Sequence, residues 1–403
     1  MTLRDRLRFE GTDESHRVTS LELFFDLVFV YALTQVTALL AADPTWGGVA
    51  RGSVILGMLW FAWCSYAWLG NQAKADEGVV RAGLVAAMMP MFVVALATIE
   101  AFDDLDGGWY GPLVFAVAMI LVRAVHLLVY AIAAGDDRGL LLQLARTAAS
   151  VSVWATLLVI GCFFDGTTQL VIWFAALTVD YLGIYFGGTE GWRLNAPSHF
   201  AERHGLIVII ALGESIVALG VGAAEKPVSG PLITAVVLGL VVSVAMWWAY
   251  FDVVAPVAER VLHSTQGADR ARLGRDSYTY LHFPMVAGIV FLALGLKKVI
   301  EYVADSEHHD LVDPLTGVPL LALYGGVVMY LLAHVAFRLR NVHSVNRQRV
   351  VASAVLVALT PVAGRLPALA ALGVLAAVLV ALIGFESTRY AAARHSIRHA
   401  SPH

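Results

Sequence analysis

Residues 199–222 read HFAERHGLIVIIALGESIVALGVG, a polar start followed by a long apolar run. The polar start holds four ionisable residues, His199, Glu202, Arg203 and His204. A run of about 20 apolar residues is long enough to cross the hydrocarbon core of a bilayer as a helix. Glu214 is the one ionisable residue inside the run, and such a group is expensive in a membrane and usually faces protein or water. The stretch therefore predicts a transmembrane helix and marks Glu214 as a candidate functional residue.

The composition extends this prediction to the whole chain. Of 403 residues, 59% are hydrophobic and 14% are charged, against about 25% charged in a typical soluble domain. We expect an all-α, polytopic helical bundle of about 12 spans, within a range of about 10 to 12. The predicted spans are residues 19–42, 50–70, 79–101, 111–134, 144–163, 168–187, 201–222, 230–251, 278–300, 316–338, 350–363 and 366–386. Prolines interrupt the last pair, which leaves two full spans and a re-entrant pair both open.

The basic residues predict the topology. Most of the 27 Lys and Arg residues fall in alternate connections, beginning with the segment before the first span. The positive-inside rule then places both termini in the cytoplasm. Residues 252–277 form the longest connection, either a basic loop or a short amphipathic surface helix. The expected parts are a cytoplasmic leader, two six-helix halves and a basic cytoplasmic tail, at residues 1–18, 19–195, 196–388 and 389–403.

Short internal similarities suggest that the two halves are repeats. ALTQ at residues 32–35 resembles ALGE at 211–214, and WFAW at 60–63 resembles WWAY at 247–250. The order of the similarities is preserved, which favours two parallel six-helix repeats, as in several transporter folds. Chance similarity between apolar helices is the alternative.

One group of polar residues is predicted at the cytoplasmic ends of two spans. Glu22 and Asp26 are four residues apart, so they share one face of the first helix. The residues Glu202, Arg203 and His204 begin the seventh span. Two interpretations stay open: a structural ion pair between Arg203 and the carboxylates, or a gate or ion-entry cluster.

A second group is predicted near the middle of the bilayer. It consists of Arg123, Asp180 and Glu214, with Gln35 and His126 at similar depth. One arginine facing two carboxylates leaves a surplus negative charge, which would take up a proton or a cation in hydrocarbon. The alternative is neutral, with Arg123 paired to one acid and the other acid protonated or bonded to Gln35 or Ser215.

No cofactor or metal site is predicted. His199-x-x-Glu202-x-His204 lacks the His-x-x-x-His spacing of helical zinc sites. The sequence also has no glycine-rich phosphate loop and no nucleic-acid motif, which argues against an ATP-driven pump. The expected partners are the lipid bilayer and an unknown small solute or ion, without nucleic acid.

Two motifs resemble the signatures of the low temperature requirement A (LtrA) family. They are RVTSLELFFDLVFV at residues 17–30, and HFAERHG at 199–205 followed by ALGES at 211–215. The resemblance covers nearly the whole chain, including WWAYFD at 247–252. It implies a bacterial multi-pass membrane protein; the family is named for a cold-growth trait, so the resemblance carries over no catalytic or substrate-binding residues.

The leading hypothesis is a secondary transporter in the bacterial cytoplasmic membrane, coupled to protons or cations through Glu214 and Asp180. A non-catalytic receptor or assembly factor is the first alternative. An intramembrane lipid-modifying enzyme is the second, with Glu22, Asp26, Glu202 and His204 as acid and base groups. The sequence leaves the substrate, the coupling ion and the oligomeric state open.

Overall fold

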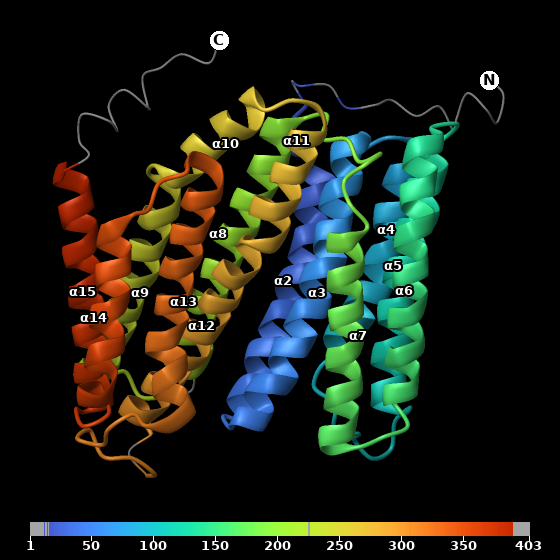
Figure 1. Ribbon diagram of the computed structural model, residues 1–403. Helices are drawn as coiled ribbons and strands as arrows, with labels where there is room; N and C mark the ends of the chain where they lie inside the picture. The colour runs from blue at the N-terminus through green and yellow to red at the C-terminus, as the bar shows by residue number, and fades with distance from the viewer. Residues whose placement is uncertain (1–11, 13, 15, 225, 306, 390–403) are drawn as a thin grey trace. The chain divides into compact units, whose positions relative to one another are not determined.

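The computed structural model describes residues 12, 14, 16–224, 226–305 and 307–389. These residues form helices joined by loops and contain no β-strand (Figure 1). In chain order the helices are α2 (Ser20–Ala42), α3 (Trp46–Gln72), α4 (Gly78–Ala97), α5 (Gly111–Ala134), α6 (Arg138–Gly161), α7 (Gly166–Phe186), α8 (Pro197–Ala223), α9 (Gly230–Phe251), α10 (Val254–Ser264), α11 (Gly267–Leu273), α12 (His282–Ala304), α13 (Gly317–Val342), α14 (Arg347–Ala363) and α15 (Ala368–Arg389), with a π-helical turn, η1 (Gly274–Tyr280), between α11 and α12. The predicted leader at 1–18 and tail at 389–403 lie almost entirely outside the described residues.

Within the described chain, 11 helical segments are long and apolar enough to cross a membrane. The prediction of a polytopic helical bundle is confirmed. Helix α14 has 17 residues, or about 25 Å at 1.5 Å per residue, slightly less than the hydrocarbon thickness. Both members of the last predicted pair, α14 and α15, are continuous helices that pack on each other.

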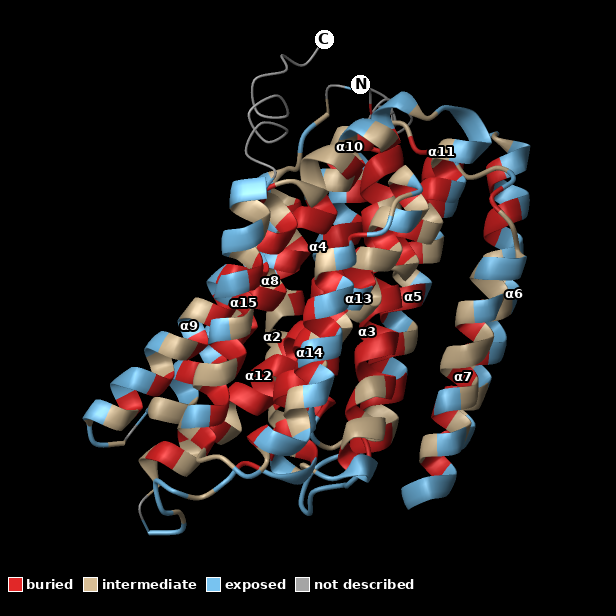
Figure 2. Cartoon of the chain, turned by 60° about the vertical axis from the view of Figure 1, so that its left-hand side comes forward, coloured by how far each residue is buried: buried red, intermediate tan, exposed pale blue. Residues whose placement is uncertain are grey.

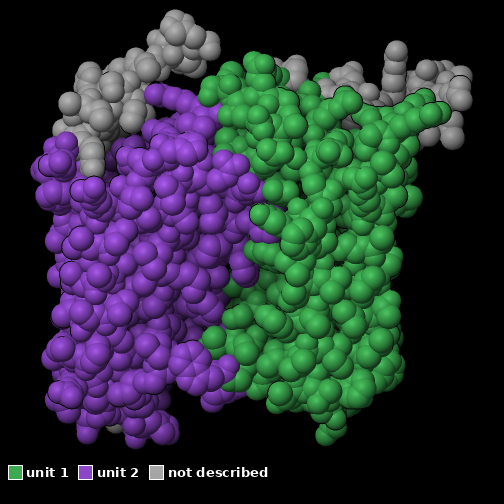
Figure 3. Space-filling view, viewed as in Figure 1, with its two compact units in different colours: residues 1–39, 47–203, 262–275 green, residues 40–46, 204–261, 276–403 purple. Residues whose placement is uncertain are grey.

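The chain forms two compact units (Figure 3). The first unit comprises residues 1–39, 47–203 and 262–275, and the second comprises 40–46, 204–261 and 276–403. The boundary falls inside the continuous helix α8, between Arg203 and His204. The two six-helix repeats and their boundaries stay a prediction, because compactness alone does not establish internal symmetry.

In the first unit, α4, α5, α6 and α7 pack in sequence order. Most of the apolar surface of α6 and α7 remains exposed, as the pale and tan stretches of these helices in Figure 2 show. Only 28% and 22% of their most apolar windows are buried. An exposed apolar face on a membrane helix is the surface that meets lipid.

In the second unit, glycines allow α12 and α13 to approach closely. A Cβ atom added at Gly288 would lie 2.5 Å from the carbonyl oxygen of Gly326. A Cβ atom added at Gly326 would likewise lie 2.5 Å from the carbonyl oxygen of Gly288. At Gly295 an added Cβ would lie 2.6 Å from the Cα atom of Leu323. Helices in membranes associate through such small-residue contacts, because apolar burial gives little net driving force in lipid.

The predicted long connection at 252–277 is largely helical. It contains α10 and α11, and η1 then leads into α12. In η1 the amide of Leu281 donates to the carbonyl oxygen of Asp276, 3.2 Å away, which is the five-residue spacing of a π turn. The turn lets the ring of Tyr278 stack on His282, with centroids 5.1 Å apart. Such turns frequently occur at functional sites.

Candidate functional site

Two carboxylates of α2 share one arginine of α8, all inside the first unit. Arg203 Nη1 donates to Glu22 Oε1 at 2.7 Å, and Arg203 Nη2 donates to Asp26 Oδ1 at 2.8 Å. The helical spacing of Glu22 and Asp26 stacks the carboxylates one turn apart, which suits the two-pronged guanidinium. All three side chains are at most 1% exposed. We call these residues, with His199 and Trp63, the Arg203 cluster.

The remaining members of the Arg203 cluster bind the carboxylates from other sides. His199 Nε2 lies 3.0 Å and 3.2 Å from the two carboxylate oxygens of Glu22. The indole Nε1 of Trp63 donates to Asp26 Oδ1 at 2.9 Å, and the Trp63 ring lies under the guanidinium, 5.6 Å from its carbon. The amide and hydroxyl of Thr19 donate to Glu22 Oε2. Charge-assisted bonds of this kind hold a buried ionic group in one geometry.

Three polar atoms of the cluster have no hydrogen-bond partner among the described residues. They are Oδ2 of Asp26, Nδ1 of His199 and Nε of Arg203. With both carboxylates ionised and His199 neutral, the cluster carries one surplus negative charge. Burying a net charge costs several kcal/mol, so a cluster with two carboxylates and one guanidinium favours a compensating positive charge.

A possible metal-ligand group adjoins the cluster. Ligand atoms of His16, Glu22 and His199 lie within 4.8 Å of one another. Arg203 already places a positive charge 2.7 Å from Glu22 Oε1. A metal ion bound by the same carboxylate would lie near that guanidinium, and like charges repel strongly in a buried site. The contact with Arg203 therefore disfavours a metal ion at Glu22.

The other two residues predicted beside Arg203 lie elsewhere. Glu202 is exposed, and its carboxylate is 4.0 Å from Arg17 and 3.4 Å from the backbone amide of Val18. His204 belongs to the second unit, where its ring lies 5.2 Å from the rings of both Tyr278 and His282.

The structure pairs two of the residues predicted near the middle of the bilayer. Arg123 Nη2 donates to Asp180 Oδ1 at 3.0 Å, and Arg123 Nη1 donates to Ser65 Oγ at 2.7 Å and to the Phe61 carbonyl at 3.1 Å. Both ionic side chains are buried. The pair has no net charge, because one guanidinium faces one carboxylate. The first unit also holds the other two candidates of this depth. His126 packs against the rings of Tyr66 and Tyr130, and Gln35 is half-buried.

Glu214 is buried in α8 within the second unit. The neighbouring hydroxyl of Ser215 bonds to Ser243 Oγ at 2.8 Å and donates to the Leu212 carbonyl at 2.6 Å. The Ser215 hydroxyl thus donates within α8 and contacts Ser243, and the neutral arrangement around Glu214 stays a prediction.

A model of the bacterial low temperature requirement A protein (LtrA) matches residues 17–384, which include both polar motifs. The chain belongs to the LtrA family. A curated relative, the uncharacterized protein RA0937 of Rhizobium meliloti (strain 1021), is 29% identical over 334 residues, or 80% of this chain and 79% of that protein. No solved structure matches the chain.

This LtrA-family chain also contains a histidine–tyrosine cluster that the sequence reasoning missed. In the second unit, Tyr250 Oη lies 2.8 Å from His282 Nε2, and the Ser277 carbonyl lies 3.0 Å from the other ring nitrogen. His334 packs 5.7 Å from the Tyr250 ring. The rings come from helices α9, α12 and α13 and the π turn, so no local spacing in the sequence announces them.

Proposed function

We propose that this LtrA-family protein is a proton-coupled secondary transporter of a small solute in the bacterial cytoplasmic membrane. One observation carries the proposal. Two fully buried carboxylates share a single arginine, and one oxygen of Asp26 has no partner within the described part of the chain. By contrast, Arg123 pairs with the single acid Asp180 in the same unit, so that pair has balanced charges. The second carboxylate exceeds the positive charge of Arg203, and its excess negative charge can bind and release a proton.

Proton exchange at such a site links to transport through electrostatics. When the proton leaves, the surplus charge must be compensated by water, a cation or a rearrangement of the helices. A transporter uses this requirement to couple proton movement to the opening of its solute site toward one side of the membrane. Glu214 is the second candidate for coupling, because it is a buried acid within an apolar span.

The burial of the cluster disfavours the enzyme alternative. A lipid-modifying enzyme requires its acid and base groups within hydrogen-bond reach of the substrate. Glu22 and Asp26 have no exposed surface in the structure, and Arg203 binds both of them.

The test uses purified protein in vesicles that contain a pH-sensitive dye. Gradients of amino acids, sugars and carboxylic acids are applied one at a time, and solute-driven proton movement is recorded. We expect one solute class to move protons with the wild type. Asp26→Asn removes the surplus charge, so it should abolish proton movement while exchange of labelled solute across the membrane continues. Glu214→Gln tests the second acid in the same way.

Glu202→Gln is the matched control, because it removes an exposed acid next to Arg203 in sequence and leaves the cluster intact. It should behave as the wild type. Equal proton movement in Asp26→Asn and in the wild type would exclude the Arg203 cluster as the coupling site. Absence of proton movement with every solute class would count against the transporter.

A further inference from the structure

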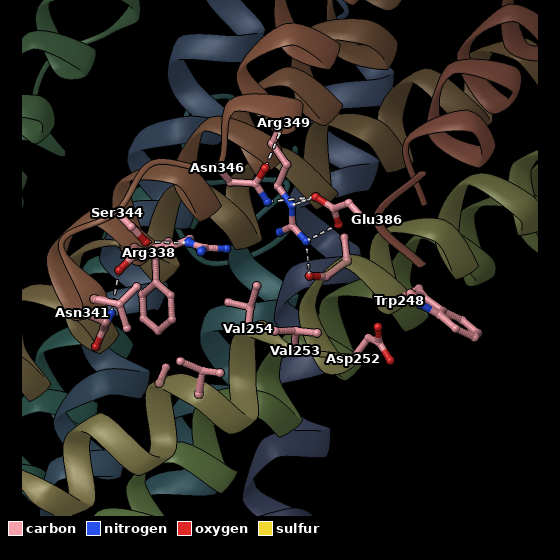
Figure 4. Close-up of a pocket in the computed structure, with 15 residues that line it drawn as sticks. Trp248, Asp252, Val253, Val254, Arg338, Asn341, Ser344, Asn346, Arg349 and Glu386 are labelled. Atoms are coloured by element: carbon pink, nitrogen blue, oxygen red, sulfur yellow. Dashed lines mark hydrogen bonds and ion pairs between the residues drawn. The ribbon is translucent and has the colours of Figure 1, made fainter. Parts of the chain in front are cut away.

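The second unit contains a pocket of about 360 Å³ that the sequence reasoning did not anticipate (Figure 4). Its walls come from the end of α9, the start of α10, the end of α13, the start of α14 and one residue of α15. The volume is within the range of small-molecule sites. The arginine distribution assigns this end of the helices to the cytoplasmic side, where anionic headgroups and soluble metabolites are both accessible.

One wall of the pocket is apolar. Val254 and Val257 contribute from α10, and Phe337 contributes from α13. Apolar walls with a few placed polar groups are typical of sites for small organic ligands. The positively charged groups of the lining are two guanidiniums, of Arg338 and Arg349, which Figure 4 shows extending toward the same space.

Arg349 is held in place by Glu386, and its Nη1 remains available as a hydrogen-bond donor to a ligand. Its Nε and Nη2 donate to the two oxygens of Glu386 at 3.0 Å and 2.9 Å, and Nη2 also donates to the Ala249 carbonyl at 2.8 Å. Its Nη1 has no partner among the described residues, although only 4% of the side chain is exposed. A buried charged donor left without an acceptor destabilises the folded chain. This atom therefore favours an acceptor from outside the chain.

Two further residues of the lining carry buried or fixed donors. The indole Nε1 of Trp248 is buried and has no partner among the described residues, although Figure 4 shows its ring on the Asp252 side, away from the two guanidiniums. Arg338 donates through Nε to Ser344 Oγ at 2.9 Å, which fixes its guanidinium at the pocket. Asn346 donates to Glu386 Oε1 at 2.9 Å, so that carboxylate is already occupied by chain donors. Asp252 lines the Trp248 side of the pocket in Figure 4, which leaves the space between Arg338 and Arg349 for a negative group.

We propose that this pocket binds an oxyanion, a carboxylate or a phosphate, carried on a short apolar chain. The oxyanion accepts from Arg349 Nη1 and from the Arg338 guanidinium, and the apolar chain packs on Val254, Val257 and Phe337. Arginine forks suit the geometry of carboxylate and phosphate oxygens. The proposal is independent of proton coupling, because it involves no residue of the Arg203 cluster.

Two sources supply this chemistry, a soluble organic anion and an anionic lipid, and the experiment separates them. For the soluble arm, the full chain in uncharged phosphatidylcholine nanodiscs is titrated with hexyl phosphate and, in parallel, with hexanol. The readout is the thermal unfolding midpoint and the indole fluorescence. For the lipid arm, native mass spectrometry measures retention of phosphatidylglycerol against phosphatidylcholine.

Variants test the residues without removing the Arg349–Glu386 pair. Arg338→Gln should weaken hexyl phosphate binding, or phosphatidylglycerol retention, about tenfold or more, since a charge-assisted hydrogen bond contributes about 1.5–3 kcal/mol. Val254→Phe fills the pocket and should weaken binding without altering its charges. Arg340→Gln is the matched control, because Arg340 pairs with Asp276 and does not line the pocket.

Binding of hexyl phosphate that depends on Arg338, without enrichment of phosphatidylglycerol, supports the pocket as a site for a soluble anion. Retention of phosphatidylglycerol that depends on Arg338 supports it as a lipid site. Equal binding of hexyl phosphate and hexanol overturns the proposal. So does binding that is unchanged in both Arg338→Gln and Val254→Phe, or loss of binding to the same extent in Arg340→Gln.

Discussion

Arg203 Nη2 lies 2.8 Å from Asp26 Oδ1, although 177 residues separate them in the sequence. Both side chains are buried, and the same guanidinium also binds Glu22. The relationship joins the first transmembrane helix to the start of α8 within one unit. It also gives the site two carboxylates for one guanidinium, and the proposed activity depends on that imbalance.

The shape of the Arg203 guanidinium is predicted to matter as much as its charge. Lysine keeps the positive charge but cannot bond both carboxylates in a fork. Arg203→Lys should therefore lower the free energy of unfolding by about 1.5–3 kcal/mol, the contribution of one hydrogen bond to a charged group. Thermal unfolding of the purified protein measures this. An unchanged midpoint would mean that the second contact contributes nothing.

The Arg123–Asp180 pair is predicted to be structural. Asp180→Asn leaves a buried, uncompensated arginine and should destabilise the protein by about 3–5 kcal/mol. Replacing both partners, as Arg123→Met with Asp180→Leu, should recover most of that loss, because buried pairs are often replaceable by apolar residues of similar volume. The yield of folded protein and the unfolding midpoint report both effects. A double variant less stable than Asp180→Asn would assign the pair another role.

Close packing of α12 on α13 predicts a strong effect of one methyl group. Gly288→Ala places a Cβ atom 2.5 Å from the Gly326 carbonyl and 3.0 Å from the Tyr330 amide nitrogen. Overpacking of this kind costs about 1–3 kcal/mol. Gly325→Ala is the control, since an added Cβ meets nothing within 4 Å there. Similar unfolding midpoints for the two variants would contradict the tight interface.

The loop between α12 and α13 predicts a pH effect. A hydrogen bond from His308 is the main cause that holds the pKa of Asp305 below its usual value, and Lys226, 3.6 Å away, acts in the same direction. A carboxylate with a lowered pKa contributes stability above its unfolded-state pKa, and that contribution is lost as the pH falls through the folded-state value.

His308→Ala should raise the pKa of Asp305 toward its usual value, and carbon NMR of labelled aspartate measures the change. His309→Ala is the control, because His309 lies 3.7 Å from Asp313 instead. Equal changes in the pKa of Asp305 in the two variants would contradict this prediction.

The helical architecture could be predicted because apolar runs report directly on membrane insertion. The four-residue spacing of Glu22 and Asp26 also predicted a shared face, and Arg203 was named as their possible partner. The same reasoning missed His199 and Trp63 as ligands of the two acids. Their contacts depend on how α3 and α8 pack against α2, which no local pattern encodes.

The pocket shows the same limit. Arg338, Arg349 and Glu386 appeared in the sequence as ordinary basic and acidic residues of helix ends. Only the packing of α9, α13, α14 and α15 reveals that Glu386 fixes Arg349 and leaves one nitrogen open. Whether a polar atom lacks a partner depends on how the helices pack, so it cannot be predicted from the spacing of residues in the sequence.

The most direct test of the central claim is infrared difference spectroscopy of the protein in vesicles, recorded from acidic to alkaline pH. The account predicts that wild type and Glu202→Gln release one proton from the Arg203 cluster, seen in carboxyl or imidazole bands, and that Asp26→Asn does not. Identical difference spectra for Asp26→Asn and the wild type would contradict an exchangeable proton at this site.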